Sequence, residues 1–119
     1  MISVQTFRQL ALSFPETKEQ PHFEKRAFRT KRKIFATLSE KDKLACVKFS
    51  QTDQSVFCAF DSSVIYPVPN KWGLQGWTYI DLTKVKKAML VDALNTAYAE
   101  AVPKAVTKKH TNSTEQKKQ

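Results

Sequence analysis

Apolar residues recur at helical spacing near both ends of the chain. Four of them follow an i, i+3, i+4, i+7 pattern near the N-terminus: Phe7, Leu10, Ala11 and Phe14. We expect this first helix to begin after Ser3, a suitable N-cap, and to stop at Pro15, because proline disfavours helical geometry in the residue before it. A longer helix is predicted from Thr83 to Val102, with a broad apolar stripe interrupted only by Asp92 and an end marked by Pro103.

The segment between these helices has the shorter pattern that is typical of β-strands. The alternation is clearest in one strand, where Phe35 and Thr37 lie between Ile34, Ala36 and Leu38. Prolines in the first and fifth expected strands indicate sheet edges, because proline cannot donate a ladder hydrogen bond. We expect a hairpin turn at Lys31 and Arg32, between the second and third strands. The expected strands are residues 17–23, 27–30, 33–39, 44–49, 64–69 and 77–82.

A short helix is expected between the fourth and fifth of these strands. Thr52 or Asp53 can cap it, because both side chains accept hydrogen bonds from the first turn of a helix. The spacing of Val56, Phe57 and Phe60 predicts that they form its apolar face.

Both tryptophans and both glycines of the chain fall in one block, Trp72-Gly73-Leu74-Gln75-Gly76-Trp77. Such a block predicts an unusual turn, since glycine permits positive φ and close backbone approach. Each tryptophan could fill the core or stack on a flat ligand. The energies do not distinguish these two roles, because stacking a base and burying a large side chain each contribute about 1–3 kcal/mol. We expect Trp77, which opens a strand, to be structural, and Trp72, beside Lys71, is the better candidate of the two for a surface contact.

The length of 119 residues predicts one domain, residues 1–103, because it allows a single core. Residues 104–119 are rich in lysine, lack apolar periodicity and are expected to be disordered. They could form a basic arm or a solubilising end. The chain shows no apolar run long enough to cross a bilayer and no signal-peptide pattern, which favours a cytoplasmic protein. Cys46 and Cys58 are expected to be reduced.

Positive charge is the strongest feature of the composition. The formal net charge is +9, and residues 24–48 alone carry nine basic and three acidic side chains. A charge of this size favours a polyanionic partner: nucleic acid, an anionic membrane surface or an acidic protein.

The order of elements and several local motifs resemble the MmcQ/YjbR family of small bacterial proteins. The motifs are Ala11–Pro15, Ala27–Arg29, Lys33–Ala36, Lys71–Leu82 and the helix that contains Tyr98. The resemblance implies an α+β fold in which an antiparallel sheet packs against the N-terminal helix and the long C-terminal helix. That fold is grouped with frataxin-like and double-wing domains, and the family is commonly described as DNA-binding by structural analogy.

One departure from the family pattern concerns the hairpin turn. Family members often turn with a Gly-Gly pair, whereas this chain has Thr30-Lys31-Arg32. The substitution removes backbone freedom and adds charge at the tip, which favours contact with phosphate groups.

These observations identify a candidate nucleic-acid interface. Alternate residues of a hairpin face the same side, so Lys25, Arg29, Lys31 and Lys33 could line one surface. DNA is the expected partner and RNA is possible. The same cations could instead keep a solvated turn soluble or bind an acidic protein or a membrane. The candidate binding residues are Lys25, Arg26, Arg29, Lys31, Arg32, Lys33, Lys71 and Trp72.

Catalytic and metal-binding patterns are poorly represented. His22 and His110 are the only histidines, and no paired Cys/His spacing, nucleophile elbow or phosphate-binding glycine loop occurs. We therefore expect a non-catalytic binding protein without a metal or cofactor. A frataxin-like protein-interaction module that meets an acidic partner is the alternative, and an enzyme for a small anionic metabolite is a more remote one.

Overall fold

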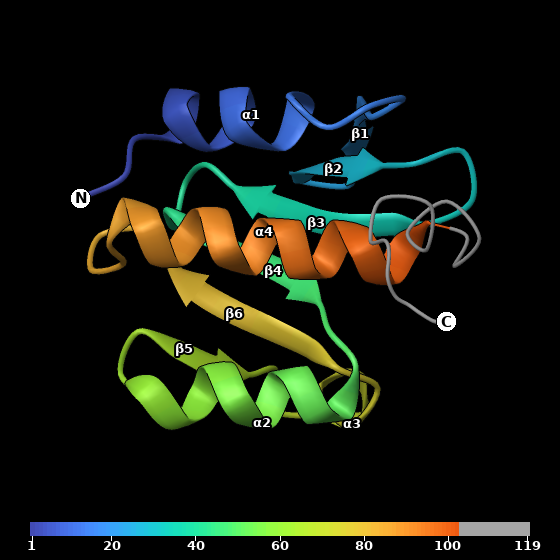
Figure 1. Ribbon diagram of the computed structural model, residues 1–119. Helices are drawn as coiled ribbons and strands as arrows, with labels where there is room; N and C mark the ends of the chain where they lie inside the picture. Colours follow the sequence, from blue (N-terminus) through green and yellow to red (C-terminus); the bar gives the residue numbers. More distant parts are fainter. Residues whose placement is uncertain (103–119) are drawn as a thin grey trace.

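One antiparallel sheet organises residues 1–102, the part of the chain that the computed structural model describes (Figure 1). Its six strands follow the order β1-β2-β3-β4-β6-β5, so the expected α+β fold is confirmed. The predicted tail, residues 104–119, lies outside the described residues. The strands are β1 (Lys18–His22), β2 (Lys25–Arg29), β3 (Ile34–Ser39), β4 (Leu44–Lys48), β5 (Ile65–Pro67) and β6 (Trp77–Asp81). The helices are α1 (Val4–Leu12), α2 (Gln51–Phe60), α3 (Lys71–Leu74) and α4 (Lys87–Ala101).

Helices α1 and α4 lie on the same face of the sheet (Figure 1). Aromatic rings fill the space beneath them. Phe7 of α1 meets Phe28 of β2 edge to face, with ring centroids 5.6 Å apart. Phe14 stacks on Tyr98 of α4 at 4.7 Å, and the Tyr98 hydroxyl donates to the Pro15 carbonyl at 2.8 Å. The segment that follows α1 is thereby fixed to α4.

The ends of the two long helices differ in how well the sequence predicts them. Ser3 is the N-cap of α1, as expected, and its hydroxyl accepts from the Thr6 N–H at 3.0 Å. α4 begins at Lys87, later than predicted, because the carboxylate of Asp81 first holds a turn. Asp92 is exposed and does not interrupt the apolar stripe. The buried stripe consists of Leu90, Ala93, Leu94, Ala97 and Ala101.

A β-bulge changes the expected alternation in β3. Phe28 of β2 pairs with Ala36, whereas the next residue, Arg29, pairs with Ile34. Phe35 therefore has no partner on β2, and both Phe35 and Ala36 are fully buried. The prediction of strict alternation is wrong at Phe35. Because of the bulge, Ile34 and Arg29 face away from the helices.

Helix α2 lies at the β5 edge of the sheet and is capped earlier than expected (Figure 1). Its N-cap is Ser50, whose hydroxyl accepts from the Asp53 N–H at 3.1 Å. The predicted cap at Thr52 or Asp53 is therefore wrong. Asp53 instead supports the cap, because its carboxylate accepts from the Ser50 hydroxyl at 3.0 Å.

Only part of the predicted apolar face of α2 is buried. Phe57 stacks on Phe49 with ring centroids 4.7 Å apart. Val56 and Phe60 are 54% and 70% exposed, so the predicted apolar face is buried only at Phe57. The helix covers a sheet edge and not a sheet face, which leaves it a narrower buried stripe.

Proline occurs in both edge strands of the sheet, as the sequence predicts. β1 contains Pro21 and β5 ends at Pro67. Each edge strand pairs with a neighbour on one side only, β1 with β2 and β5 with β6.

Candidate functional site

The sheet face opposite α1 and α4, here called the open face, carries mostly partly exposed side chains. Strand pairing aligns these side chains in rows across the sheet. The middle row consists of Gln20, Ala27, Thr37, Cys46, Tyr79 and Tyr66. A second row, nearer to one end of the strands, consists of Lys18, Arg29, Ile34, Lys48 and Trp77. Side chains from all six strands therefore meet on one surface.

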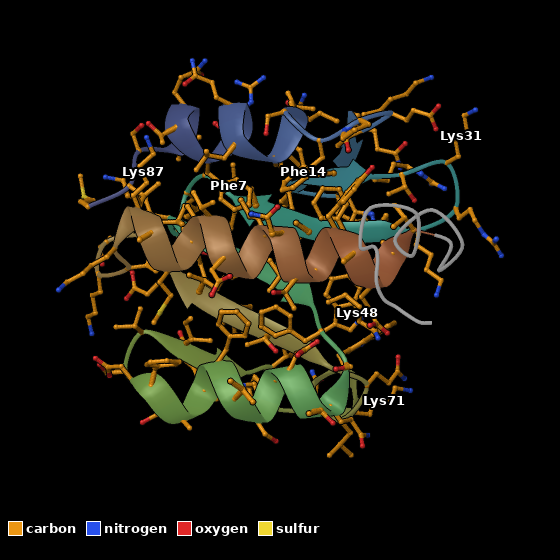
Figure 2. All side chains as sticks on the ribbon, in the orientation of Figure 1. Phe7, Phe14, Lys31, Lys48, Lys71 and Lys87 are labelled. Atoms are coloured by element: carbon orange, nitrogen blue, oxygen red, sulfur yellow. The ribbon has the colours of Figure 1, made fainter. Side chains whose placement is uncertain are left out.

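One end of the open face carries a dense group of cations. Because neighbouring strands are antiparallel, β2 and β4 end there and β1, β3 and β6 begin there. Figure 2 shows Lys31, Lys48 and Lys71 along this end, with Lys87 at the opposite end. The group, here called the basic end, consists of Lys18, Arg29, Lys31, Arg32, Lys33, Lys48 and Lys71.

A cavity of about 410 Å³ separates the basic end from the last turn of α4. Its lining includes Arg29, Arg32, Lys33, Lys48, Trp77 and Glu100. Among residues 1–102, the only ion pair of the basic end joins Lys31 to Glu16 at 3.9 Å, and both side chains are largely exposed. Exposed ion pairs contribute little free energy, so the cations are available to an anionic ligand.

Thr30 shapes the hairpin turn that lacks the family's glycine pair. Its hydroxyl accepts from the backbone N–H groups of Arg32 and Lys33, each at 3.1 Å. The backbone N–H of Thr30 donates to the Lys33 carbonyl at 2.9 Å. No residue of this turn has positive φ, which explains how it forms without glycine. The buried Thr30 side chain also lies 3.5 Å from the Ala101 carbonyl, next to the end of α4.

Arg26 is the one hairpin candidate that faces the helices. Its Nε donates to Glu19 at 2.6 Å, and the Nε of Arg8 on α1 donates to the same carboxylate at 3.1 Å. Burial raises the pKa of Glu19, but the hydrogen bonds and charges of the two arginines outweigh it and hold that pKa below 4.5. Arg26 therefore joins α1 to the hairpin, whereas Lys25 and Arg29 line the open face.

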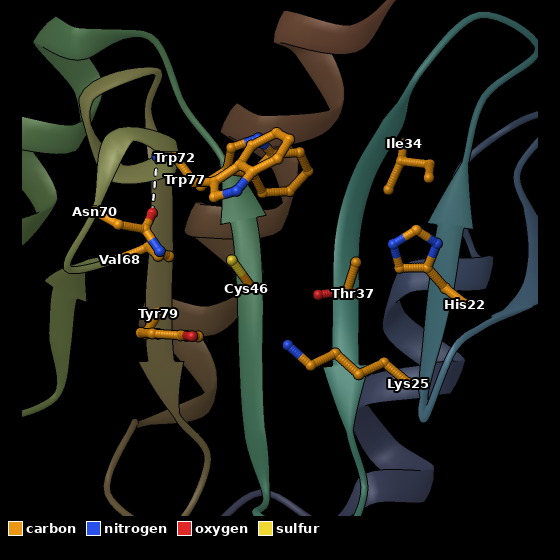
Figure 3. Close-up of a pocket in the computed structure, with 10 residues that line it drawn as sticks. All are labelled: His22, Lys25, Ile34, Thr37, Cys46, Val68, Asn70, Trp72, Trp77 and Tyr79. Carbon is orange, nitrogen blue, oxygen red and sulfur yellow. Dashed lines mark hydrogen bonds between the residues drawn. The ribbon is translucent and has the colours of Figure 1, made fainter.

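A groove of about 540 Å³ runs across the open face (Figure 3). Lys25 crosses in front of β3 and ends between β3 and β4. Trp72 and Trp77 lie toward one end of the groove, and Tyr79 lies along β6. The lining consists of His22, Lys25, Ile34, Thr37, Cys46, Val68, Asn70, Trp72, Trp77 and Tyr79.

The two tryptophans share this groove, although the sequence favours different roles for them. Trp72 is 51% exposed, in agreement with its prediction as a surface residue. Trp77 is half-buried, but it lies on the open face and not in the core under the helices. Lys48 is its direct partner across β4 and β6. An aromatic ring and a cation therefore stand side by side where the groove meets the basic end.

Glutamines of α2 hold the tryptophan block in place. The Gln54 amide donates to the Gly73 carbonyl at 2.9 Å and to the Trp77 carbonyl at 3.2 Å. The Gln51 amide donates to the Leu74 carbonyl at 2.9 Å. The Gly73 and Trp77 carbonyls also accept from the backbone N–H groups of Gly76 and Val68, each at 3.0 Å, so the glutamines add to the backbone bonds that position the groove.

Both glycines of the block are required by close backbone approach. A Cβ on Gly73 would lie 1.9 Å from the Val68 carbonyl oxygen. A Cβ on Gly76 would lie 1.9 Å from the Phe49 carbonyl oxygen, and Gly76 also has φ of 108°. The prediction of an unusual turn is confirmed, with the short helix α3 inside it.

Cys46 forms part of the groove floor as a free thiol. Burial raises the pKa of this thiol to about 11, although the nearby positive charge of Lys25 opposes the shift. At neutral pH Cys46 is therefore protonated and presents a weakly polar surface. Cys58 is also free, as expected.

Several residues of this surface fall outside the candidate set from sequence. Lys48 lies beyond the charged hairpin, Thr37 and Cys46 belong to no motif, and Tyr79 lies in the Lys71–Leu82 motif without a feature that marks it as a binding residue. One signal could have found them. Trp77 and Tyr79 are two residues apart, so they lie on the same face of their strand. Pairing that strand with β4 places Lys48 opposite Trp77 and Cys46 opposite Tyr79.

Comparisons with known proteins agree with this architecture. The Deinococcus radiodurans protein DR2400, with a DUF419 domain, has a similar crystal structure, with a TM-score of 0.72 and 19% sequence identity. The likeness covers 94% of this chain and 84% of that one. No curated protein sequence matches.

Residues 1–102 lack two further features. No helix there has both the length and the apolar character needed to cross a bilayer, and no cluster of three metal-ligating side chains occurs. A family profile, in contrast, matches most of the chain: that of YjbR, over residues 12–100. The chain belongs to the YjbR family.

Proposed function

We propose that this protein binds nucleic acid, with DNA as the expected form, by docking phosphates at the basic end of its open face. The observation that carries the proposal is the separation of charge between the two ends of the sheet. At the basic end, the acids of the described residues that lie nearest the seven cations are Glu16, Glu100 and Asp53. At the other end, Lys41, Lys43, Lys84, Lys86 and Lys87 are accompanied by four acids, Glu40, Asp42, Asp61 and Asp81.

The geometry of the basic end suits a row of phosphates. Its cations come from the ends of β2 and β4, the starts of β1 and α3, and the hairpin turn. Arg29 and Arg32 can grip a phosphate in a bidentate fork, whereas the lysines act as point charges. Each phosphate that they neutralise would release condensed counterions, which favours binding at low salt.

The proposal does not include a catalytic step. The thiol in the groove is protonated at neutral pH, and a thiol is a far weaker nucleophile than a thiolate. The groove residues instead offer cations, aromatic faces and hydrogen-bond donors, which are means of binding.

The test is binding to labelled duplex DNA across a salt series. One variant replaces Arg29, Arg32, Lys33 and Lys48 with glutamine, which keeps a polar side chain and removes four charges. The matched control replaces Lys41, Lys84, Lys86 and Lys87 with glutamine, so both variants have the same net charge. Wild-type affinity should fall with salt, with a slope of about 0.9 for each phosphate contacted.

The first variant should lose most of the affinity and flatten the salt slope, while the control should retain both. Equal losses in the two variants would show that net charge alone drives the binding and would refute the site. Feeble wild-type binding to DNA, with tight binding to one acidic protein, would favour the protein-interaction alternative.

A further inference from the structure

We infer that the groove on the open face binds unpaired nucleotides of a single strand, with bases stacked on Trp77, Tyr79 and Trp72. The inference rests on the proposed nucleic-acid binding and adds the state of the strand. It concerns the groove of about 540 Å³, which adjoins the smaller cavity beside α4 at Ile34 and Trp77.

The lining of the groove suits a flat ring with polar edges. Trp77, Tyr79 and the half-exposed Trp72 provide aromatic faces, and Ile34 and Val68 add apolar contacts. A volume of about 540 Å³ lies within the range of about 300–1,000 Å³ that is typical of small-ligand sites. The groove can therefore hold a nucleobase with its sugar.

Polar groups at the rim can meet the edges of a base. Thr37 offers a hydroxyl, and His22 offers a ring nitrogen from β1. The side-chain oxygen of Asn70 accepts a hydrogen bond from the backbone N–H of Trp72 at 2.8 Å. The side-chain NH₂ of Asn70 has no partner among the described residues. These groups combine donors and acceptors, as base edges require.

The charges around the groove favour an anionic ligand. None of the lining residues is acidic. Lys48 is paired with Trp77 across the sheet, Lys71 precedes Trp72, and Lys25 reaches the opposite side of the groove. A base on the aromatic rings would thus have cations on both sides for its flanking phosphates.

An unpaired strand fits this arrangement better than a duplex. In a duplex the faces of the bases are covered by their stacked neighbours, so an aromatic platform can stack only on bases that are unpaired. Trp77 and Tyr79 are two residues apart on β6, which separates them by about 6.8 Å along the strand. Stacked bases in a duplex strand are only about 3.4 Å apart.

The test compares four probes with the full-length protein. They are an oligothymidylate of about 12 nucleotides, an abasic backbone of the same length and charge, the corresponding duplex, and thymidine monophosphate. The oligothymidylate should bind about 5- to 150-fold more tightly than the abasic backbone, the range expected for stacking one base. It alone should strongly quench the fluorescence of the two tryptophans.

Variants locate the effect. A Trp72→Leu, Trp77→Leu double variant should lose the preference for the oligothymidylate and bind it no more tightly than the abasic backbone. Phe60→Leu is the matched control, because Phe60 is an exposed aromatic residue that does not line the groove. Circular dichroism would verify that each variant folds, and the comparison of probes on the wild-type protein needs no variant.

Three results would overturn the inference. Equal affinity of the wild-type protein for the oligothymidylate and the abasic backbone, with duplex binding intact, would refute base stacking and leave phosphate docking in place. Equal quenching by thymidine monophosphate at the same concentration would assign the groove to free nucleotides. Failure to bind any strand would refute both proposals.

Discussion

Arg26 donates from its Nε to Oε2 of Glu19 at 2.6 Å, on the face of the sheet that α1 covers. Its neighbours in β2, Lys25 and Ala27, face the other way. The basic residues of this hairpin are close together in the sequence but lie on two faces of the sheet. Arg26 stabilises the contact with α1, whereas Lys25 lies on the open face.

This division predicts opposite effects for two arginine substitutions. Arg26→Gln should lower the free energy of unfolding by about 1 kcal/mol, because it removes a charge-assisted hydrogen bond to a buried carboxylate. It should leave the salt slope of DNA binding unchanged. Arg29→Gln should lower the slope with a smaller effect on stability. Denaturant unfolding and binding titrations on both variants would check this, and a flatter slope in Arg26→Gln would contradict it.

The Glu19 carboxylate should make stability depend on pH. Its side chain is 8% exposed and accepts from two arginines, so Glu19→Gln should lower the free energy of unfolding by about 1–3 kcal/mol at neutral pH. The folded protein lowers the pKa of Glu19 below its ordinary value of 4.5, so the contribution is complete above that pH. It is lost as the pH falls through the folded pKa.

The difference in stability between wild type and Glu19→Gln should therefore shrink in acid. Unfolding by urea between pH 7 and the acid range would measure it. A difference that stays constant as the pH falls would show that packing, and not charge, accounts for the effect of the substitution.

Gln54 should hold the groove in shape. Its amide nitrogen contacts the carbonyls of Gly73 and Trp77 and, at 3.1 Å, the hydroxyl of Thr78. Gln54→Glu would place a carboxylate against two carbonyl oxygens and should lower the free energy of unfolding by about 1–3 kcal/mol. Tryptophan fluorescence should also shift. Ser55→Ala, at an exposed position of the same helix, is the control and should change neither.

Gly76 should be nearly irreplaceable. Gly76→Ala combines strain at φ of 108° with a contact of 1.9 Å between the new Cβ and the Phe49 carbonyl oxygen. We expect a loss of about 3 kcal/mol or more in the free energy of unfolding. Gln75→Ala, the exposed neighbour, should cost far less. Thermal unfolding of the two variants would check the prediction, and similar melting temperatures would refute it.

Cys46 should react slowly with alkylating reagents. With a pKa of about 11 against an ordinary 9.0, its thiolate fraction at neutral pH is about 100-fold lower than that of a free thiol. In a Cys58→Ser background, the labelling rate should rise with pH until about pH 11. A rate that levels off near pH 9 would show that the thiol is not buried in this way.

Local patterns predict most of the fold because they depend on neighbours in the chain. The Ser3 cap and the alternating faces of residues 77–82 are examples. The bulge at Phe35 is different, since it depends on how β2 pairs with β3 and on the rings of Phe14 and Tyr98 above it. The pairing between two strands cannot be predicted from the sequence of one strand alone.

The candidate site shows the same contrast. The charged turn is visible as a run of basic residues, but Lys48 joins it only because β4 ends beside β3 and β6. Arg26 leaves the cluster because α1 supplies Arg8 and β1 supplies Glu19, two residues remote from the turn. Sequence spacing identifies the charge, whereas the fold decides which side chains share a face.

The prolines in β1 and β5 have a consequence for how this protein can meet other chains. Free strand edges invite a further strand, from a second copy or from an extended peptide, and proline blocks such addition. Pro21 and Pro67 stand in the two edge strands of the sheet. Each proline removes one backbone donor from its edge strand, and α2 lies along the β5 edge, so addition of a further strand should be disfavoured at both edges of the sheet.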